Sequence, residues 1–252
     1  MNVALLVGLL LANTPEEKGR EIAQQLNAKN AGYKDLGGQV EMVLKDADGA
    51  EAKRGFSLKV LERPSATEGD RSLIVFDNPA DVKGTAVLSH AKIDGEDEQW
   101  LFLPSAHRTK RISSSNRTGA FAGSEFSFED LTGNDGRKYD WKFLGNAACG
   151  EKQCLLVETV PKDPASAYSR RVLIIEEGEL RVVSIAFFDR KGTKLKTLEY
   201  GDYQKLNERF WRAQRWTMVN HQSGKSTTLR FVAMRLQNGF SANDFATGKL
   251  GN

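Results

Sequence analysis

The sequence has few of the residues from which catalytic and metal-binding sites are usually built. Its 252 residues include two cysteines and three histidines, and the histidines stand far apart, at positions 90, 107 and 221. It contains no G-x-S-x-G nucleophile elbow, no H-E-x-x-H zinc motif, no C-x-x-C pair and no glycine-rich phosphate loop. We therefore expect a protein that is not an enzyme, with no catalytic residues, no metal site and no cofactor.

A strong excess of charge of either sign is also missing. The 36 basic and 33 acidic residues give a formal net charge of +3. Nucleic-acid-binding proteins usually concentrate far more basic charge on one face, so this balance argues against that class. The apolar content of 40% and the charged content of 27% are ordinary for a globular protein.

Long apolar runs are absent apart from one at the start, Val3 to Ala12. This run is too short to cross a membrane and fits the apolar region of a signal peptide. No basic residue precedes it, and Leu10 stands where a cleavage site prefers a small residue, so a buried N-terminal helix is the alternative. We expect residues 1–12 to be a signal-peptide remnant and residues 13–252 to form one domain. The mature protein is then soluble and periplasmic.

The two cysteines, Cys149 and Cys154, are separated by the turn-like sequence GEKQ. One even pair in an exported chain is typical of a disulfide, and the flanking segments read as the two strands of a hairpin. A redox or metal pair is the alternative, but the spacing does not fit C-x-x-C. We therefore predict a structural disulfide.

A helix is predicted at the start of the domain. Thr14 can cap it, Pro15 suits the first helical position, and Glu17 completes a capping box, so the helix should run to about Lys29. Its apolar stripe consists of Ile22, Ala23 and Leu26.

After this helix the apolar period changes from about 3.6 residues to 2, which indicates β-strands. Short connections with turn chemistry separate roughly a dozen such segments. This arrangement is typical of an antiparallel meander. The expected strands are 39–45, 56–61, 72–76, 86–92, 99–103, 139–144, 155–160, 171–176, 181–188, 195–203, 209–219 and 227–236.

A meander of this length has to protect its edges, by closing into a barrel, folding into two sheets or curling around something. One helix precedes the strands, and a short one can begin near 241–244. We therefore expect a mainly β protein. Its single, strongly curved antiparallel sheet should form a half-open β-barrel, with the N-terminal helix and short helical segments on the concave side.

A basic cluster follows the strand that ends at Pro104. It contains His107, Arg108, Lys110, Arg111 and Arg117. One interpretation is a solvated strand end and loop. The other is a docking patch, made by the four Arg and Lys residues, for anionic headgroups or an acidic partner protein.

The stretch from Gln99 to Leu131 resembles the signature of the LolA-like outer-membrane lipoprotein-sorting family. The matching segments are WLFLP (100–104), KRI (110–112), FAGSEF (121–126) and EDL (129–131). The resemblance implies a LolA/LolB-type half-barrel with a hydrophobic cavity under helices. It further implies a periplasmic carrier that binds lipoprotein acyl chains or another lipid for transfer toward the outer membrane.

The same resemblance implies membrane partners, because members of this branch often work beside an inner-membrane transporter of the resistance-nodulation-division type. Possible partners are that transporter and an outer-membrane acceptor, with no nucleic acid involved and a monomeric carrier. The alternative function is a non-catalytic accessory subunit of the transporter. An open apolar cavity would favour the carrier, and a packed interior the accessory subunit.

A curled sheet of this length should leave more apolar surface than one helix covers, and such surface usually marks a binding site. Three phenylalanines in a loop, Phe121, Phe126 and Phe128, can serve as an anchor onto the core or as a lid over the cavity. The residues that we expect to bind lipid are Trp100, Phe102, Phe121, Phe126, Phe187, Trp216 and Met218.

Overall fold

One antiparallel sheet makes up most of the computed structural model, which describes residues 13–63, 67–93, 95–113, 116–132 and 135–251. Thirteen strands are present in these residues, and the expected mainly β fold is confirmed. In chain order they are β1 (Asp35–Lys45), β2 (Glu51–Leu61), β3 (Glu68–Asn78), β4 (Ala86–Lys92), β5 (Glu98–Leu103), β6 (Arg108–Ile112), β7 (Tyr139–Cys149), β8 (Lys152–Pro161), β9 (Tyr168–Glu176), β10 (Arg181–Asp189), β11 (Lys194–Leu206), β12 (Phe210–Asn220) and β13 (Ser226–Leu236). The expected signal peptide, residues 1–12, lies outside the described residues.

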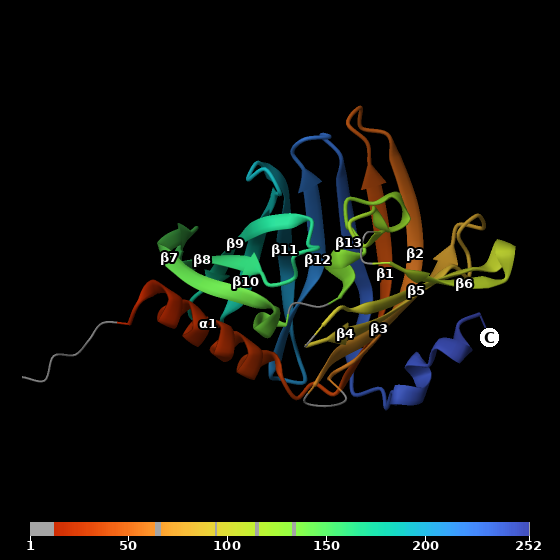
Figure 1. Cartoon of the computed structure of the whole chain (residues 1–252), viewed down its shortest axis with the longest axis horizontal. Coiled ribbons are helices and arrows are strands. Elements are labelled where there is room, and N and C mark those ends of the chain that lie inside the picture. Colours follow the sequence, from red (N-terminus) through yellow and green to blue (C-terminus); the bar gives the residue numbers. More distant parts are fainter. Residues whose placement is uncertain (1–12, 64–66, 94, 114–115, 133–134, 252) are drawn as a thin grey trace, which may run out of the picture.

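The strands form two meanders that meet in the middle of the sheet (Figure 1). The first runs outward from β1 to the edge strand β6. The chain then crosses to the opposite edge, β7, and returns strand by strand to β13, which pairs with β1. Every ladder is antiparallel, and among the described residues none joins β6 to β7, so the curved sheet stays open.

The N-terminal helix α1 (Pro15–Asn30) has the predicted capping box. The Thr14 hydroxyl accepts from the Glu17 amide at 3.2 Å, and the Glu17 carboxylate accepts from the Thr14 amide at 2.8 Å. The helix packs against β7 on the concave side, and its predicted apolar stripe is buried in the main core. Gly19 lies so close to β7 that a Cβ there would be 2.7 Å from the backbone of Trp141 and Lys142.

This contact leads to a prediction about Gly19. In an open helix, Gly→Ala stabilises by about 1 kcal/mol through helix propensity. Here we expect Gly19→Ala to destabilise by about 1–3 kcal/mol, because the added methyl group overlaps strand backbone that has no room to move. Urea unfolding checks this. Ala28→Gly, at an exposed position of the same helix, is the control that reports propensity alone; a stabilised Gly19→Ala variant would contradict the prediction.

Between β6 and β7 the chain crosses from one edge to the other, and the described residues of this crossing segment, 113, 116–132 and 135–138, lie on the concave side of the sheet (Figure 1). They include 3-10 turns at Phe121–Gly123, Glu129–Leu131 and Gly136–Lys138. Phe121 and Phe126 belong to the main hydrophobic core. Of the two expectations for these phenylalanines, the structure therefore supports an anchor onto the core.

After β13 the chain crosses the opposite, convex face. It forms 3-10 turns at Ala242–Phe245 and Thr247–Lys249. The first of these is the predicted C-terminal helical segment, with a capping box between Ser241 and Asp244. The carbonyl of Phe245 lies 2.8 Å from Nε2 of His90, which fixes this segment over the first meander.

The predicted disulfide is confirmed at the far edge of the second meander. Cys149 ends β7 and Cys154 lies in β8, with their Cα atoms 5.9 Å apart and their sulfur atoms bonded. The bridge therefore closes the hairpin that forms the β7 edge of the sheet.

A buried ion pair ties the crossing segment to the sheet. Nζ of Lys196, on β11, lies 2.7 Å from Oδ2 of Asp130 and 2.9 Å from the carbonyl of Glu125. The two charged side chains are 5% and 7% exposed. Asp130 also accepts hydrogen bonds from the amide and hydroxyl of Ser127 and from the hydroxyl of Tyr168. Asp130 is thus held by charge and by four donor groups.

Removing one partner of this pair should be costly, because the other charge stays buried without compensation. We expect Lys196→Met to lower the free energy of unfolding by about 3–5 kcal/mol. The control is Lys225→Met, which breaks an ion pair with Asp46 whose two side chains are 50% and 56% exposed. The control should leave the urea midpoint unchanged, and equal losses in both variants would refute the assignment of Asp130–Lys196 as an anchor.

Candidate functional site

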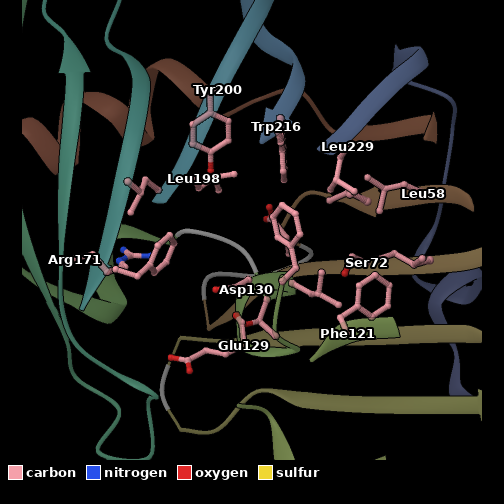
Figure 2. A pocket seen from close by; sticks show the side chains of 18 of the residues that line it. Leu58, Ser72, Phe121, Glu129, Asp130, Arg171, Leu198, Tyr200, Trp216 and Leu229 are labelled. Carbon is pink, nitrogen blue, oxygen red and sulfur yellow. The ribbon is translucent and has the colours of Figure 1, made fainter. Parts of the chain in front are cut away.

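An apolar chamber lies between the concave face of the sheet and the crossing segment. It has a volume of about 190 Å³. Figure 2 shows Tyr200, Trp216 and Leu229 of the sheet on one side and Phe121, Glu129 and Asp130 of the crossing segment on the other. The crossing segment therefore supplies one wall of the chamber and the sheet supplies the other.

A second compartment of about 390 Å³ continues from this chamber. The two share eight lining residues, among them Leu58, Arg171, Tyr200, Trp216 and Phe231, so they adjoin along a common wall. The outer compartment is bordered by the last turn of α1 and by the adjacent ends of β10 and β12. The complete cavity thus leads from the middle of the sheet to the C-terminal end of the helix.

The outer compartment reaches the place where β12 and β13, the last two strands of the second meander, stop pairing. In the described residues, β12 pairs with β13 only from Arg215–Val219 to Ser226–Arg230, although β12 begins at Phe210 and β13 continues to Leu236. Ala213 and Met234, from the parts of the two strands that diverge, both line the compartment. The sheet therefore opens at the point where the cavity approaches the surface.

Three aromatic rings form the wall that the two compartments share. The ring of Trp216 lies 5.3 Å from that of Tyr200 and 5.3 Å from that of Phe231, measured between centroids. The indole nitrogen of Trp216 donates to the carbonyl of Ala213 at 3.2 Å. Because the polar edge of the indole is hydrogen-bonded to backbone, the ring faces are available for apolar contact.

The polar side chains that line the inner chamber are mostly engaged with protein groups. Arg171 is 4% exposed, donates from Nε to the Thr159 hydroxyl at 3.1 Å and stacks 3.6 Å above the ring of Tyr139. Glu129 accepts from the Ser166 hydroxyl and, at 2.9 Å, from the Ala167 amide. Burial raises the pKa of the Glu129 carboxyl above its usual range. These groups hold the crossing segment in place.

Four of the seven residues that were predicted to bind lipid line the inner chamber. They are Phe121, Phe126, Phe187 and Trp216. Met218 is fully buried in the main core, where it pairs across strands with Leu198. The position of the four residues agrees with the expectation, and lipid binding by them stays a prediction.

Trp100 and Phe102 were expected to reach the cavity, and this expectation is wrong. Both lie on the convex face of β5: the ring of Trp100 packs 5.0 Å from that of His90, and Phe102 lies under Gly251. The inward residue of β5 is instead Gln99, whose side-chain amide donates to the Ser89 hydroxyl and the Phe128 carbonyl. The alternation of side chains in a strand does not show which of its two faces points into the barrel. Here the C-terminal segment covers the face that carries Trp100 and Phe102, so these rings are half-buried on the outside of the sheet.

The four residues of the predicted docking patch do not lie together: one is buried and three lie on β6. Arg117 is 5% exposed and pairs with Asp163 at 2.8 Å and with Asp97 at 3.9 Å, so it was wrongly assigned to the surface.

The other three residues of the patch, Arg108, Lys110 and Arg111, lie on the exposed edge strand β6. Arg111 forms a surface ion pair with Glu98. Basic side chains on an edge strand also discourage pairing with other chains, and docking through them stays a prediction.

Sequence reasoning missed Tyr200, Phe231 and Arg171 as cavity residues. Tyr200 and Phe231 could have been found from alternation, because each follows a buried leucine by two positions on the same face, Leu198 and Leu229. Arg171 gave no such signal, because a basic residue inside an apolar strand reads as solvent-exposed.

Two classes of site are not found in the part of the chain that the structure describes. It contains no group of three or more histidine, cysteine, aspartate or glutamate residues that could hold a metal ion. None of its helices combines the length and the apolar character that crossing a membrane requires.

Comparisons with known proteins give one consistent result. A family model described as an uncharacterized protein matches residues 68–252. A domain from Vibrio parahaemolyticus named for outer-membrane lipoprotein sorting is 40% identical, with a TM-score of 0.91 over 94% of this chain and 100% of that chain. A DUF1329 family protein from Desulfovibrio piger is 25% identical, with a TM-score of 0.89 and the same coverage. No curated protein matches the chain.

A LolA superfamily protein from Nitrosomonas europaea shares the fold, with a TM-score of 0.75 at 19% identity over 95% of this chain and 100% of that chain. The open antiparallel sheet with its N-terminal helix therefore has the same half-barrel fold as that protein. Within that class, the chain belongs to the outer-membrane lipoprotein-sorting family, together with its DUF1329 relatives. The resemblance seen in residues 99–131 is confirmed.

Proposed function

We propose that this protein is a periplasmic, non-catalytic carrier that holds lipoprotein acyl chains or another lipid in the cavity and delivers them toward the outer membrane. The observation that carries the proposal is the pair of adjoining, mainly apolar compartments on the concave side of the sheet, with Tyr200, Trp216 and Phe231 in their common wall. The relative from Vibrio parahaemolyticus, which is named for lipoprotein sorting, supports the same role. The disulfide supports an oxidising compartment such as the periplasm.

Burial of an acyl chain supplies enough free energy for such a role. Each methylene group removed from water contributes about 0.8 kcal/mol. Ten buried methylenes would contribute roughly 8 kcal/mol before the costs of association, which reduce the net affinity. A carrier has to release its cargo, so an interaction that depends on area rather than on specific hydrogen bonds suits reversible transfer.

The alternative, an accessory subunit of an inner-membrane transporter, predicts a packed interior. The cavity favours the carrier over that alternative. Contact with such a transporter and with an outer-membrane acceptor remains part of the carrier proposal, with a monomer as the transferring species. The exposed basic residues Arg108 and Lys110 are the candidates for docking.

The cavity proposal is tested by a pair of neighbouring substitutions on β13. Phe231 lines both compartments, whereas Val232 is 71% exposed and points away. We expect Phe231→Glu to weaken the binding of a fluorescent acyl probe at least tenfold, because a carboxylate in the cavity would have to be desolvated beside the chain. Val232→Glu adds the same charge one residue away and should bind the probe like the parent.

Both variants should first be compared by circular dichroism, so that only folded protein is titrated. Mass spectrometry of protein purified from a native-like host gives a second, independent measurement, and we expect a co-purified lipid. If folded Phe231→Glu binds the probe as tightly as Val232→Glu, the cavity does not hold acyl chains and the accessory function replaces the carrier.

A further inference from the structure

Basic side chains outnumber acidic ones in the described lining of the outer compartment, whereas three acidic residues and one basic residue line the inner chamber. Among the described lining residues of the outer compartment, five are basic and two are acidic. The basic ones are Lys29, Arg171, Arg181, Arg209 and Arg212, and the acidic ones are Asp70 and Glu179. Both compartments are mainly apolar, and the balance of their charged side chains is acidic in the inner chamber and basic in the outer one.

Two of these basic residues are already neutralised by carboxylates. Arg181 pairs with Glu176 through Nε at 2.7 Å, and Lys29 lies 3.5 Å from Glu179. Asp70, the other acid of the compartment, accepts from the Tyr33 hydroxyl at 2.9 Å and from a backbone amide at 3.0 Å. Of the other three basic residues, Arg171 lies in the wall shared with the inner chamber, and Arg209 and Arg212 lie at the start of β12, Arg209 directly before the strand and Arg212 within it.

Arg209 and Arg212 donate to neutral acceptors. Arg209 donates from Nη2 to the carbonyl of Ala31 at 3.0 Å, and Arg212 donates from Nη1 to Oδ1 of Asn30 and to the carbonyl of Trp211, each at 3.0 Å. All three acceptors are neutral, and in the described residues neither guanidinium forms an ion pair with a carboxylate within 4 Å. Because Asn30 and Ala31 are consecutive, the two guanidinium groups are neighbours.

Aromatic rings support both groups at this position. The guanidinium of Arg209 lies 4.8 Å from the ring centroid of Phe210, and that of Arg212 lies 5.1 Å from Tyr33 and 5.5 Å from Phe210. Stacking of this kind orients a planar guanidinium and leaves its N–H edge for hydrogen bonds in the ring plane. A pair of oriented guanidinium groups matches the oxygen geometry of a phosphate or a carboxylate.

We propose that the cargo is an anionic amphiphile, with its acyl chain in the inner chamber and its phosphate or carboxylate headgroup at Arg209 and Arg212. The proposal rests on the carrier function and adds the charge of the headgroup and its place at the mouth. It fits the order of the cavity, in which the aromatic wall of Tyr200, Trp216 and Phe231 comes before the arginine pair.

The test compares pairs of amphiphiles that differ only in charge. The first pair is a palmitoyl lysophosphatidate and monopalmitoylglycerol, and the second is palmitate and palmityl alcohol, each used to displace a fluorescent acyl probe. We expect the anionic member to bind the parent about tenfold or more tightly than the neutral one, because a charge-assisted bidentate hydrogen bond is lost in the neutral lipid. Inorganic phosphate alone should not displace the probe or the lysophosphatidate.

The double variant Arg209→Gln/Arg212→Gln should bring the two members of each pair to the same affinity. Since both arginines also hold the end of α1, unchanged binding of monopalmitoylglycerol is the internal evidence that the cavity is intact. The matched control, Arg230→Gln/Arg235→Gln, removes the same charge from two exposed positions of β13 that line neither compartment, and it should keep the full preference of the parent.

The outcomes separate this proposal from the carrier function. Equal binding of charged and neutral lipids by the parent overturns the headgroup site and leaves the carrier in place. Binding of none of the four amphiphiles refutes the carrier itself. Displacement of lysophosphatidate by millimolar inorganic phosphate would mean that the arginines bind a free anion rather than a lipid headgroup. If the double variant also fails to bind monopalmitoylglycerol, its cavity is damaged. The proposal is then decided by whether the parent binds the anionic member of each pair more tightly than the neutral one.

Discussion

The buried pair of Asp130 and Lys196 is the interaction on which the shape of the cavity depends. The chain has to cross from the β6 edge to the β7 edge before the second meander can begin. A crossing that lay loosely would leave the concave face open to water. Because Asp130 is bound by Lys196, Ser127 and Tyr168, the crossing is fixed at a set height above the sheet. The cavity is the space that remains between them.

The segment that carries the family resemblance therefore has two structural roles. Phe121 and Phe126 contribute apolar surface to the inner chamber. The carboxylates of Glu129 and Asp130, a few residues later, bind other parts of the protein. Their oxygens accept hydrogen bonds from Ser166, Ala167, Tyr168 and Lys196. A signature of this kind therefore marks the architecture of the fold as much as the lining of the cavity.

Local sequence signals allowed much of the fold to be predicted. Features that depend on contacts between residues far apart in the sequence could not be predicted from them. The capping box at Thr14, the disulfide and most strands were found because their evidence lies within a few residues. The inner face of β5 could not be found in this way, because alternation is symmetric and Trp100 and Phe102 are apolar enough for a core. What decides the face is a C-terminal segment about 140 residues later, which buries them from outside. Arg117 was misjudged for the same reason, since its partners Asp97 and Asp163 are distant in sequence.

The pairing of the first strand with the last has a consequence for how the protein is made. Leu36 stands opposite Leu236 and Lys45 opposite Ser226, so the central ladder joins opposite ends of the chain. Each meander can form hairpins on its own from neighbouring strands, but the two become one sheet only when β13 is available. Contacts of such long sequence separation form late, because the entropy of closing the intervening loop must be overcome first. A nascent chain therefore cannot complete the concave face and its cavity until β13 has emerged.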